Sequence, residues 1–415
     1  MKMRKILALV MAMAMCLALL TACGGGSNNN ANSPAPSQSG SEPANTGDAL
    51  PGDGTTYEIL VTNHDSDTSR GAQYMKDLGE MMGAYVAANS TDTLKFEIFN
   101  GGSMYSGAEC YDAVMAGNAD MCWGAAAFYS GRFPIAEFIQ LPLNGINCAQ
   151  MGSKVFMDMM NEIPEAAAEW DGVKVIQLQG NCPGPLSTTK AYGKIETPDQ
   201  LKGLQFRTAG TTAGLWVSAV GMVPVTVPTP DTYEYLEKNI VNGCMNDWHN
   251  IDAFKLQEVI GYTMNYTVST SPCFVVMNQA KYDSMPQHVK DAIDLYSGAY
   301  ASDMAGWYWD TCVFTTGAEM EAAGVEIYTP NDELLAFMTS DSIKDQVHAD
   351  YIKYLNDKGL DGQAIYDKCM EIVARYADQY ANVYDTEFAI ADWATSDTAK
   401  ADLEANAAAL GITLG

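Results

Sequence analysis

The residues best suited to hold a small molecule lie between Thr197 and Asp252. Arg207 ends a predicted strand, which follows a short helix that Thr197 caps and Pro198 opens. Its guanidinium is a planar fork of N–H donors that fits a carboxylate, and ligands of open α/β sheets bind at strand ends. The chain has 51 Asp+Glu against 23 Lys+Arg, so pairing with a nearby surface acid is the alternative interpretation. We predict that Arg207 orients a carboxylate or another polar group of a ligand.

Two further candidates lie at the end of the strand predicted over residues 240–246 and just after it. Asn246 offers both a donor and an acceptor, and Trp248 offers a flat apolar wall. Both kinds of side chain are common in small-molecule sites. The alternative for Trp248 is a contact within the core or between lobes. We predict Asn246 beside Arg207, with Trp248 shaping the same pocket.

Two loops of the N-terminal half are expected to complete this pocket. His64 lies in the polar loop after the first predicted strand, and Ala125 lies in the small-residue run Gly124–Ala127 after the third. Loops that follow parallel strands lie at the ligand-binding edge of a sheet. His64, Asp65 and Asp67 provide too few oxygens at fixed spacing for a hard-cation site, so no metal is predicted. We interpret this loop as a helix cap that faces the cleft.

Catalytic residues are not predicted. Cys244, His249 and Asp252 have the residue types of a nucleophile, a base and an orienting acid, but proximity in sequence is not the geometry that such sets need. The chain has no Gly-Lys-Ser phosphate loop, no His-Glu-x-x-His helix and no nucleophile elbow. Neither enzyme activity nor a cofactor is expected.

Alternating strands and helices must position the candidate residues. Strands are predicted at residues 57–62, 94–99 and 119–123, and a helix from about Arg70 has apolar residues at three- and four-residue spacing. This β-α-β-α-β order indicates a parallel sheet with covering helices. The part of the chain after the N-terminal segments is long enough for two lobes of ordinary domain size.

The first 23 residues have the features of an export signal. Three basic residues precede the apolar run Ile6–Leu20, and Leu20-Thr21-Ala22-Cys23 has the pattern of a lipobox. A transmembrane anchor is the alternative, but the run is short for spanning a bilayer. Cys23 is therefore predicted to be lipidated and to anchor the protein to the membrane from outside the cytoplasm. Residues 24–54, rich in Gly, Ser, Asn and Pro, are predicted to be a flexible tether.

Net charge and cysteine content restrict the partners and the redox chemistry. The formal net charge is −28, and removing the basic signal makes it more negative, which argues against nucleic-acid binding and adhesion to anionic lipid. Of ten cysteines, Cys16 and Cys23 belong to the signal and the anchor. The others permit disulfides, but several lie in apolar runs and none has metal-ligand spacing. We predict mostly reduced thiols.

Several motifs resemble those of one receptor family. Leu201-Lys202-Gly203-Leu204 precedes Arg207, and Val241-Asn242-Gly243-Cys244-Met245-Asn246 follows. Asn100-Gly101-Gly102-Ser103-Met104 and Gly117-Asn118-Ala119-Asp120-Met121 lie in register on the N-terminal side. In order and spacing they resemble the solute-binding proteins of tripartite ATP-independent (TRAP) transporters, dicarboxylate-binding type. The resemblance covers roughly residues 57–300.

This resemblance implies a two-lobed α/β fold of the periplasmic-binding-protein type. Its discontinuous lobes are joined by strands that cross near residues 181 and 271, and a long helix, about Gln287–Met320, runs across both. The segments expected are a lipoprotein signal peptide (1–23), a tether (24–54), a first lobe (55–180 plus 272–312) and a second lobe (181–271 plus 313–415).

The resemblance also implies the function and the partners. The expected function is an extracytoplasmic receptor that captures a small organic acid between its lobes and delivers it to TRAP membrane subunits. Many relatives have an arginine where Gly184 stands, so a second cationic contact for a carboxylate is missing here. A ligand-sensing lipoprotein for a membrane sensor kinase and an extracytoplasmic enzyme are the alternatives.

Overall fold

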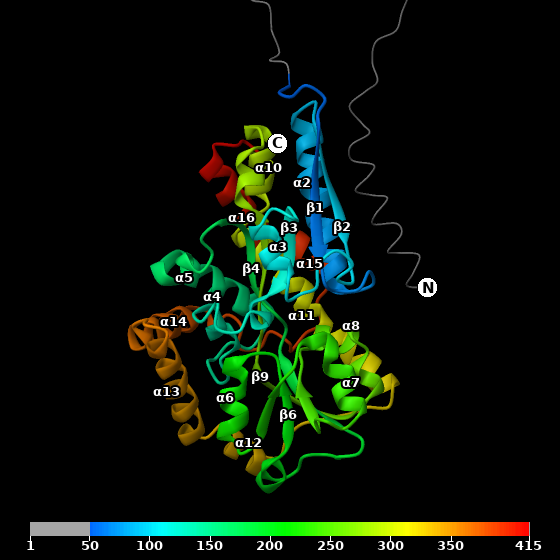
Figure 1. Ribbon diagram of the computed structural model, residues 1–415, viewed down its shortest axis with the longest axis vertical. Coiled ribbons are helices and arrows are strands. Elements are labelled where there is room, and N and C mark those ends of the chain that lie inside the picture. Colours follow the sequence, from blue (N-terminus) through cyan, green and yellow to red (C-terminus); the bar gives the residue numbers. More distant parts are fainter. Residues whose placement is uncertain (1–49, 415) are drawn as a thin grey trace, which may run out of the picture. The chain divides into compact units, whose positions relative to one another are not determined.

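The structure, a computed structural model, describes residues 50–414 (Figure 1). The predicted signal peptide, Cys23 and almost all of the predicted tether lie outside the described residues. Within residues 50–414, no helix combines the length and the apolar character needed to span a membrane.

The first sheet is built mostly from the N-terminal half of the chain. Its five strands have the order β2-β1-β3-β10-β4. β1 pairs in parallel with β2 and with β3, as the alternation of strands and helices predicts, whereas β10 runs antiparallel to β3 and β4. The strands are β1 (Thr56–Asn63), β2 (Thr93–Phe99), β3 (Met121–Ala125), β4 (Val173–Gly180) and β10 (Pro272–Asn278).

The second sheet has six strands in the order β11-β9-β5-β8-β6-β7. β6 pairs in parallel with β7 and β8, and β5 pairs antiparallel with β8 and β9. β11 pairs in parallel with β9. The strands are β5 (Gly184–Thr189), β6 (Gln205–Thr208), β7 (Val223–Thr226), β8 (Gly243–Met245), β9 (Ile260–Ser269) and β11 (Glu326–Tyr328).

The chain passes between the two sheets where the sequence predicts the crossings. Residues 181–183 connect β4 to β5, and residues 270–271 connect β9 to β10. The two connections are hydrogen-bonded to each other, because the backbone N–H of Asn181 donates to the carbonyl of Ser271 at 2.8 Å. Two adjacent connections of this kind are suited to act as a hinge.

Fifteen α-helices and five short 3₁₀-helices complete the residues that the structure describes. The helices are α2 (Arg70–Asn89), α3 (Cys110–Met115), α4 (Ala149–Glu162), α5 (Pro164–Ala168), α6 (Thr211–Ala219), α7 (Thr232–Glu237), α8 (Trp248–Ala253), α9 (Gln279–Asp283), α10 (Gln287–Leu295), α11 (Ala299–Ala322), α12 (Asp332–Met338), α13 (Asp341–Asp357), α14 (Gly362–Tyr376), α15 (Ile390–Ala394) and α16 (Asp397–Leu410). The 3₁₀-helices are η1 (Ala126–Phe128), η2 (Ala136–Gln140), η3 (Pro198–Leu201), η4 (Thr229–Asp231) and η5 (Leu256–Glu258).

Helix α11 links the elements around the two sheets. It packs against α4 and against strand β4 of the first sheet, and also against α8 and against strand β11 of the second sheet. The predicted long helix is therefore present, but its predicted start at Gln287 is wrong. Gly298, between α10 and α11, adopts a φ of 65°. A positive φ lies outside the right-handed helical region, so one continuous helix cannot pass through this residue, and glycine is the residue that adopts such a φ most readily.

The C-terminal helices do not all stay with the second sheet. α12 contacts η3 and α13 contacts α6, whereas α14 contacts α4, and α16 contacts α10 and α11. Asn406 fixes α16 by donating to the carbonyls of Leu295 and Ser297 at 2.9 and 3.0 Å. This arrangement differs from the predicted assignment of residues 313–415 to the second lobe, and the lobe boundaries stay a prediction.

Helix α4 approaches β4 closely where two glycines, Gly152 and Gly180, meet. A Cβ on Gly180 would lie 2.8 Å from the Cα of Gly152. We expect Gly180→Ala to lower the free energy of unfolding by about 1–3 kcal/mol in urea denaturation, because overpacking forces the backbones apart. Gly214→Ala, within α6, is the matched control. Its Cβ would meet nothing closer than 3.5 Å, so stability should be kept or raised. A Gly180→Ala protein as stable as the wild type would contradict the contact.

Candidate functional site

The carboxyl ends of two neighbouring strands bring Arg207 and Asn246 together. β6 and β8 run in parallel with Arg207 opposite Cys244, so the residues that end both strands lie side by side. Nη1 of Arg207 donates to Oδ1 of Asn246 at 3.0 Å. The predicted pair therefore forms in the structure.

Arg207 is a buried cation whose hydrogen-bond partners are all uncharged. It is 1% exposed. Nε donates to the carbonyl of Val227 at 3.0 Å, Nη1 to the carbonyl of Met245 at 3.3 Å, and Nη2 to Oγ1 of Thr229 at 2.9 Å. Burial lowers the pKa of Arg207 to about 10, so the guanidinium stays charged at neutral pH. A buried positive charge without an acidic partner favours an anion beside it.

The first sheet supplies the other wall of the same cavity. β1 and β3 are parallel neighbours, so the residues at their carboxyl ends, His64 and Ala125, lie at one edge of the sheet. Both line the cavity that Arg207 and Asn246 line. Its volume is about 20 Å³, which is space for about one water molecule.

The cavity also contains hydrogen-bond donors that lack a partner in the described residues. Trp123 is 1% exposed and its ring stacks on Trp309 with centroids 5.6 Å apart. Neither Nε1 of Trp123 nor Nδ2 of Asn246 makes a hydrogen bond. A buried donor left unpaired costs about 1–3 kcal/mol, which an acceptor in the cavity would recover. Together with Arg207, these donors are suited to an anionic oxygen.

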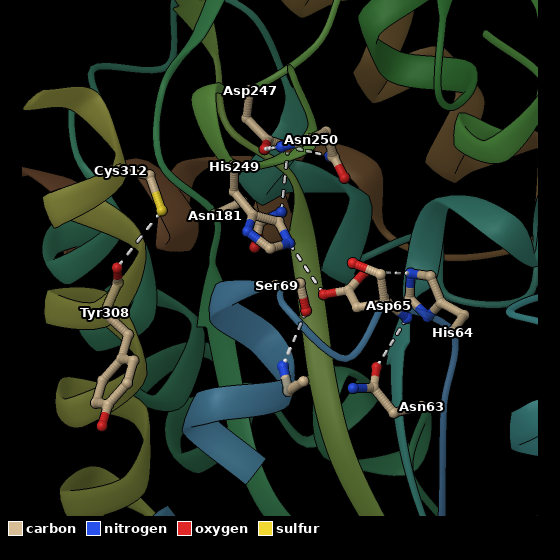
Figure 2. A network of polar contacts seen from close by, with 12 residues as sticks. Asn63, His64, Asp65, Ser69, Asn181, Asp247, His249, Asn250, Tyr308 and Cys312 are labelled. Atoms are coloured by element: carbon tan, nitrogen blue, oxygen red, sulfur yellow. Dashed lines mark hydrogen bonds and ion pairs between the residues drawn. The ribbon is translucent and has the colours of Figure 1, made fainter. Parts of the chain in front are cut away.

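His64 contributes a neutral aromatic surface. Burial lowers its pKa, which favours the uncharged imidazole, and its ring centroid lies 4.5 Å from that of Trp123. Figure 2 shows Asp65 between His64 and His249, with Nε2 of His249 at 2.9 Å from Oδ2 of Asp65. Burial opposes ionisation of His249, but the charge of Asp65 and this hydrogen bond raise its pKa well above the usual value. The loop after β1 is thus tied to α8 by an ion pair.

Asp247 lines the cavity without acting as the counter-ion of Arg207. It caps α8, because Oδ1 accepts from the backbone N–H of Asn250 at 2.8 Å, and Oδ2 accepts from Nδ2 of Asn181 at 3.1 Å. Burial raises its pKa. These contacts occupy both carboxylate oxygens, and Asp247 makes no ion pair with Arg207, although its charge opposes the lowering of the pKa of Arg207.

Trp248 does not line this cavity. It is the first residue of α8, is 4% exposed and belongs to an apolar core cluster. Its ring faces α11, since a Cβ on Gly317 would lie 3.9 Å from the ring. The predicted role of Trp248 in solute binding stays a prediction, and this placement favours the packing interpretation.

Several cavity residues were not among the predicted ones. Phe128, Thr229 and Asp247 line it, and the only sequence signals were the small-residue run before Phe128 and the prolines on either side of Thr229. Phe128, Ala127 and Ala209 also line a neighbouring, more apolar cavity of about 370 Å³. The polar cavity therefore adjoins a larger apolar one at Phe128.

Gly184, where the resemblance leads us to expect an arginine, lies close to the site. Gly184 begins β5, and a Cβ there would lie 3.3 Å from the carbonyl oxygen of Ser269 and 3.7 Å from the carbonyl carbon of Asn246. A side chain at this position would begin beside Asn246. Arg207 therefore has no cationic neighbour from Gly184.

Two members of the Cys244, His249 and Asp252 set lie in different surroundings. Cys244 is buried on β8, and burial raises its pKa to about 12, which keeps the thiol protonated. Asp252 lies near the surface and pairs with Lys255 at 2.8 Å. In residues 50–414, no cluster of three or more His, Cys, Asp and Glu is arranged to hold a metal ion.

The two sheets are joined by adjacent crossings, and a cavity lies at the carboxyl ends of strands from both. This arrangement is that of a two-lobed solute-binding protein. The family model for bacterial extracellular solute-binding proteins, family 7 (DctP), matches residues 66–351, and the chain belongs to this family. The resemblance to TRAP solute-binding proteins is thereby confirmed. The family consists of binding receptors and not of enzymes.

Relatives in sequence and in structure agree with this family. The 2,3-diketo-L-gulonate-binding periplasmic protein YiaO of Escherichia coli is 24% identical over 265 residues, covering 63% of this chain and 77% of that protein. A marine metagenome TRAP solute-binding protein specific for aromatic acid ligands, solved with 3-hydroxybenzoate, has a TM-score of 0.72 at 24% identity, covering 78% of this chain and 99% of that one. A TRAP solute-binding protein from Rhodoferax ferrireducens, solved with copurified benzoate, has a TM-score of 0.71 at 22% identity, with the same coverage of 78% and 99%. The two structures confirm the two-lobed fold.

Proposed function

We propose that this protein is a lipid-anchored extracytoplasmic receptor that delivers a small organic acid to TRAP membrane subunits. The observation that supports it most is Arg207, a buried guanidinium whose partners are all uncharged. Four of the five N–H donors of Arg207 already have partners, so a carboxylate would accept from the remaining N–H of Nη2 and from the unpaired donors of Asn246 and Trp123. The ligand itself would then be the counter-ion of Arg207.

The neighbouring apolar cavity suggests where the rest of the acid lies. The polar cavity has a volume of only about 20 Å³, whereas the adjoining cavity has about 370 Å³. Its lining includes Val227, Pro228 and Phe128, which suit an apolar body. Aromatic acid ligands and benzoate in two structural relatives support an acid with a ring.

Binding requires the site to widen. An organic acid is larger than the space beside Arg207, so Phe128 or the lobes must move to admit it. The hydrogen-bonded connections at Asn181 and Ser271 are the proposed hinge. The ligand favours the closed form only by its higher affinity for that form.

Membrane anchoring is proposed from the lipobox at Cys23, which lies outside the described residues. The tether would let the folded part reach membrane subunits. Cys23→Ala is the variant that tests the anchor, since it should move the exported protein from the membrane fraction to the soluble fraction.

Calorimetry with residues 24–415 tests the solute class. We expect benzoate, hydroxybenzoates, mandelate and aliphatic acids to include at least one ligand, and the matched amide of that ligand to bind at least about 100-fold more weakly. The physical reason is that the amide forfeits a charge-assisted pair with a buried cation. Equal affinity for the acid and its amide would contradict the proposed role of Arg207. Binding of neutral compounds alone would contradict the organic-acid assignment.

A further inference from the structure

A second polar cavity lies beside the ion pair of His249 and Asp65. Its volume is about 280 Å³, and it shares no lining residue with the cavity at Arg207. Arg70 at the start of α2, His249 on α8 and Cys312 on α11 all contribute to its wall. A thiol, an imidazole and a guanidinium therefore border one polar space.

Cys312 is not alone in this cluster. Its Sγ donates to the carbonyl of Tyr308 at 3.6 Å, a contact within α11 that Figure 2 shows. Cys312 and His249 line the same cavity. The backbone N–H of His249 donates to the Sγ of Cys182 at 3.4 Å, so a second thiol lies against the same residue. The neighbouring Cys182 thiol lowers the pKa of Cys312 against the effect of burial, and the charge of His249 lowers it further.

Asp65 holds the His249 imidazole in the charged form that favours a thiolate at Cys312. Nε2 of His249 lies 2.9 Å from Oδ2 of Asp65, which stabilises the imidazolium. A thiolate beside an imidazolium is the arrangement that makes cysteines reactive in other proteins. The thiol, the imidazole and the carboxylate come from α11, α8 and the loop after β1, which are far apart in the sequence.

Other buried thiols lack this environment and serve as controls. Cys273 lines the cavity at Arg207, but burial raises its pKa well above the usual value. Cys369 on α14 is fully buried, and burial raises its pKa as well. Comparison with Cys273 therefore shows whether lining a cavity is enough to make a thiol reactive without His249. Alkylation of Cys369 shows how much of the protein unfolds during the experiment.

We propose that Cys312 is a reactive thiolate that small hydroperoxides oxidise in the polar cavity, with Cys182 as the resolving thiol. The sulfur attacks one peroxide oxygen, so that an S–O bond forms, the O–O bond breaks, and the leaving oxygen takes a proton and departs as water or an alcohol. The Cys182 sulfur then attacks the sulfenic sulfur, an S–S bond forms, the S–O bond breaks and water leaves. The two thiols lose two electrons in total, and the peroxide gains them.

The first experiment measures the alkylation of each cysteine in the native protein. Iodoacetamide is applied at several pH values, and mass spectrometry follows each cysteine peptide. At pH 7 an ordinary thiol is a few per cent thiolate, so we expect Cys312 to react at least about 10-fold faster than Cys273, with little change in rate as the pH rises to 9. Equal rates for Cys312 and Cys273, or a Cys312 rate that matches Cys369, would overturn the proposal.

The second experiment follows the oxidation itself. Hydrogen peroxide should yield a Cys182–Cys312 disulfide peptide in the wild type. In Cys182→Ser the sulfenic acid should accumulate on Cys312 and be trapped by dimedone. A His249→Gln protein should lose most of the Cys312 rate, while Asp252→Asn, which alters a partly exposed residue of the same cavity, should keep it. Trapping on Cys273 instead, or no adduct in folded Cys182→Ser, would also overturn the proposal.

Discussion

Replacing Arg207 with Gln is expected to weaken the binding of a carboxylate ligand by at least about 100-fold in calorimetry. Removing one partner of a buried, hydrogen-bonded charge pair costs about 3 kcal/mol or more, which corresponds to that factor in Kd. Arg207→Lys should lose almost as much. Lysine keeps the charge, but it cannot reproduce the fork that now reaches Val227, Thr229 and Asn246. Near-wild-type affinity in either folded variant would show that Arg207 is structural.

A second variant, Asn246→Asp, tests the same prediction while keeping Arg207. Oδ1 of Asn246 already accepts from Nη1 of Arg207 at 3.0 Å, so an aspartate would supply the carboxylate that the ligand is proposed to bring. We expect a melting temperature at least equal to that of the wild type, together with loss of acid binding. Loss of binding in a stabilised protein separates charge neutralisation from misfolding. Acid binding that persists in this variant would place the carboxylate elsewhere.

The second large effect is a pH-dependent loss of stability that Glu137 causes. This side chain on η2 is fully buried, and burial raises its pKa to about 7 from an ordinary value of 4.5. Its Oε1 has only long contacts, at 3.4 Å, with the backbone N–H of Gly131 and the hydroxyl of Tyr354, and Oε2 has no partner in the described residues. The protonated form is therefore the one that the fold accommodates.

The sign of the effect follows from proton binding. Between pH 4.5 and about 7 the folded state keeps the proton of Glu137, whereas the unfolded state has released it. Stability is then greatest below this window and falls as the pH rises through it. One pKa unit corresponds to 1.36 kcal/mol, so this group should lower the free energy of unfolding by about 3 kcal/mol between pH 4.5 and pH 8.

Urea unfolding of the wild type and of Glu137→Gln at pH 5 and pH 8 tests this expectation. Asp310 and Glu169 also have pKa values raised by burial, so the informative quantity is the difference between the two proteins. The variant should lose less stability than the wild type. Glu162→Gln is the control. Hydrogen bonds from Arg375 and Lys368 lower the pKa of Glu162 to about 2, so its removal should shift stability equally at both pH values. Parallel pH profiles for the wild type and Glu137→Gln would refute the prediction.

Much of the fold could be predicted because its signals are local. The order of the first three strands and two helices predicts the parallel pairing of β1, β2 and β3, since parallel neighbours require crossover helices. The start of α11 could not be predicted in this way, because the apolar spacing continues through Gly298, whose φ of 65° only the structure shows.

Part of the candidate site could also be predicted from the sequence, and part of it only the structure shows. The sequence by itself determined that Arg207, Asn246, His64 and Ala125 lie at or just after the carboxyl ends of strands, and the topology rule places such residues at one edge of each sheet. The tertiary structure alone decided that the two edges face each other, that Trp123 and Phe128 enter the cavity, and that Trp248 turns toward α11. It also paired His249 with Asp65, 184 residues apart. Such contacts depend on how separate loops pack in space, which residue types and periodicity do not encode.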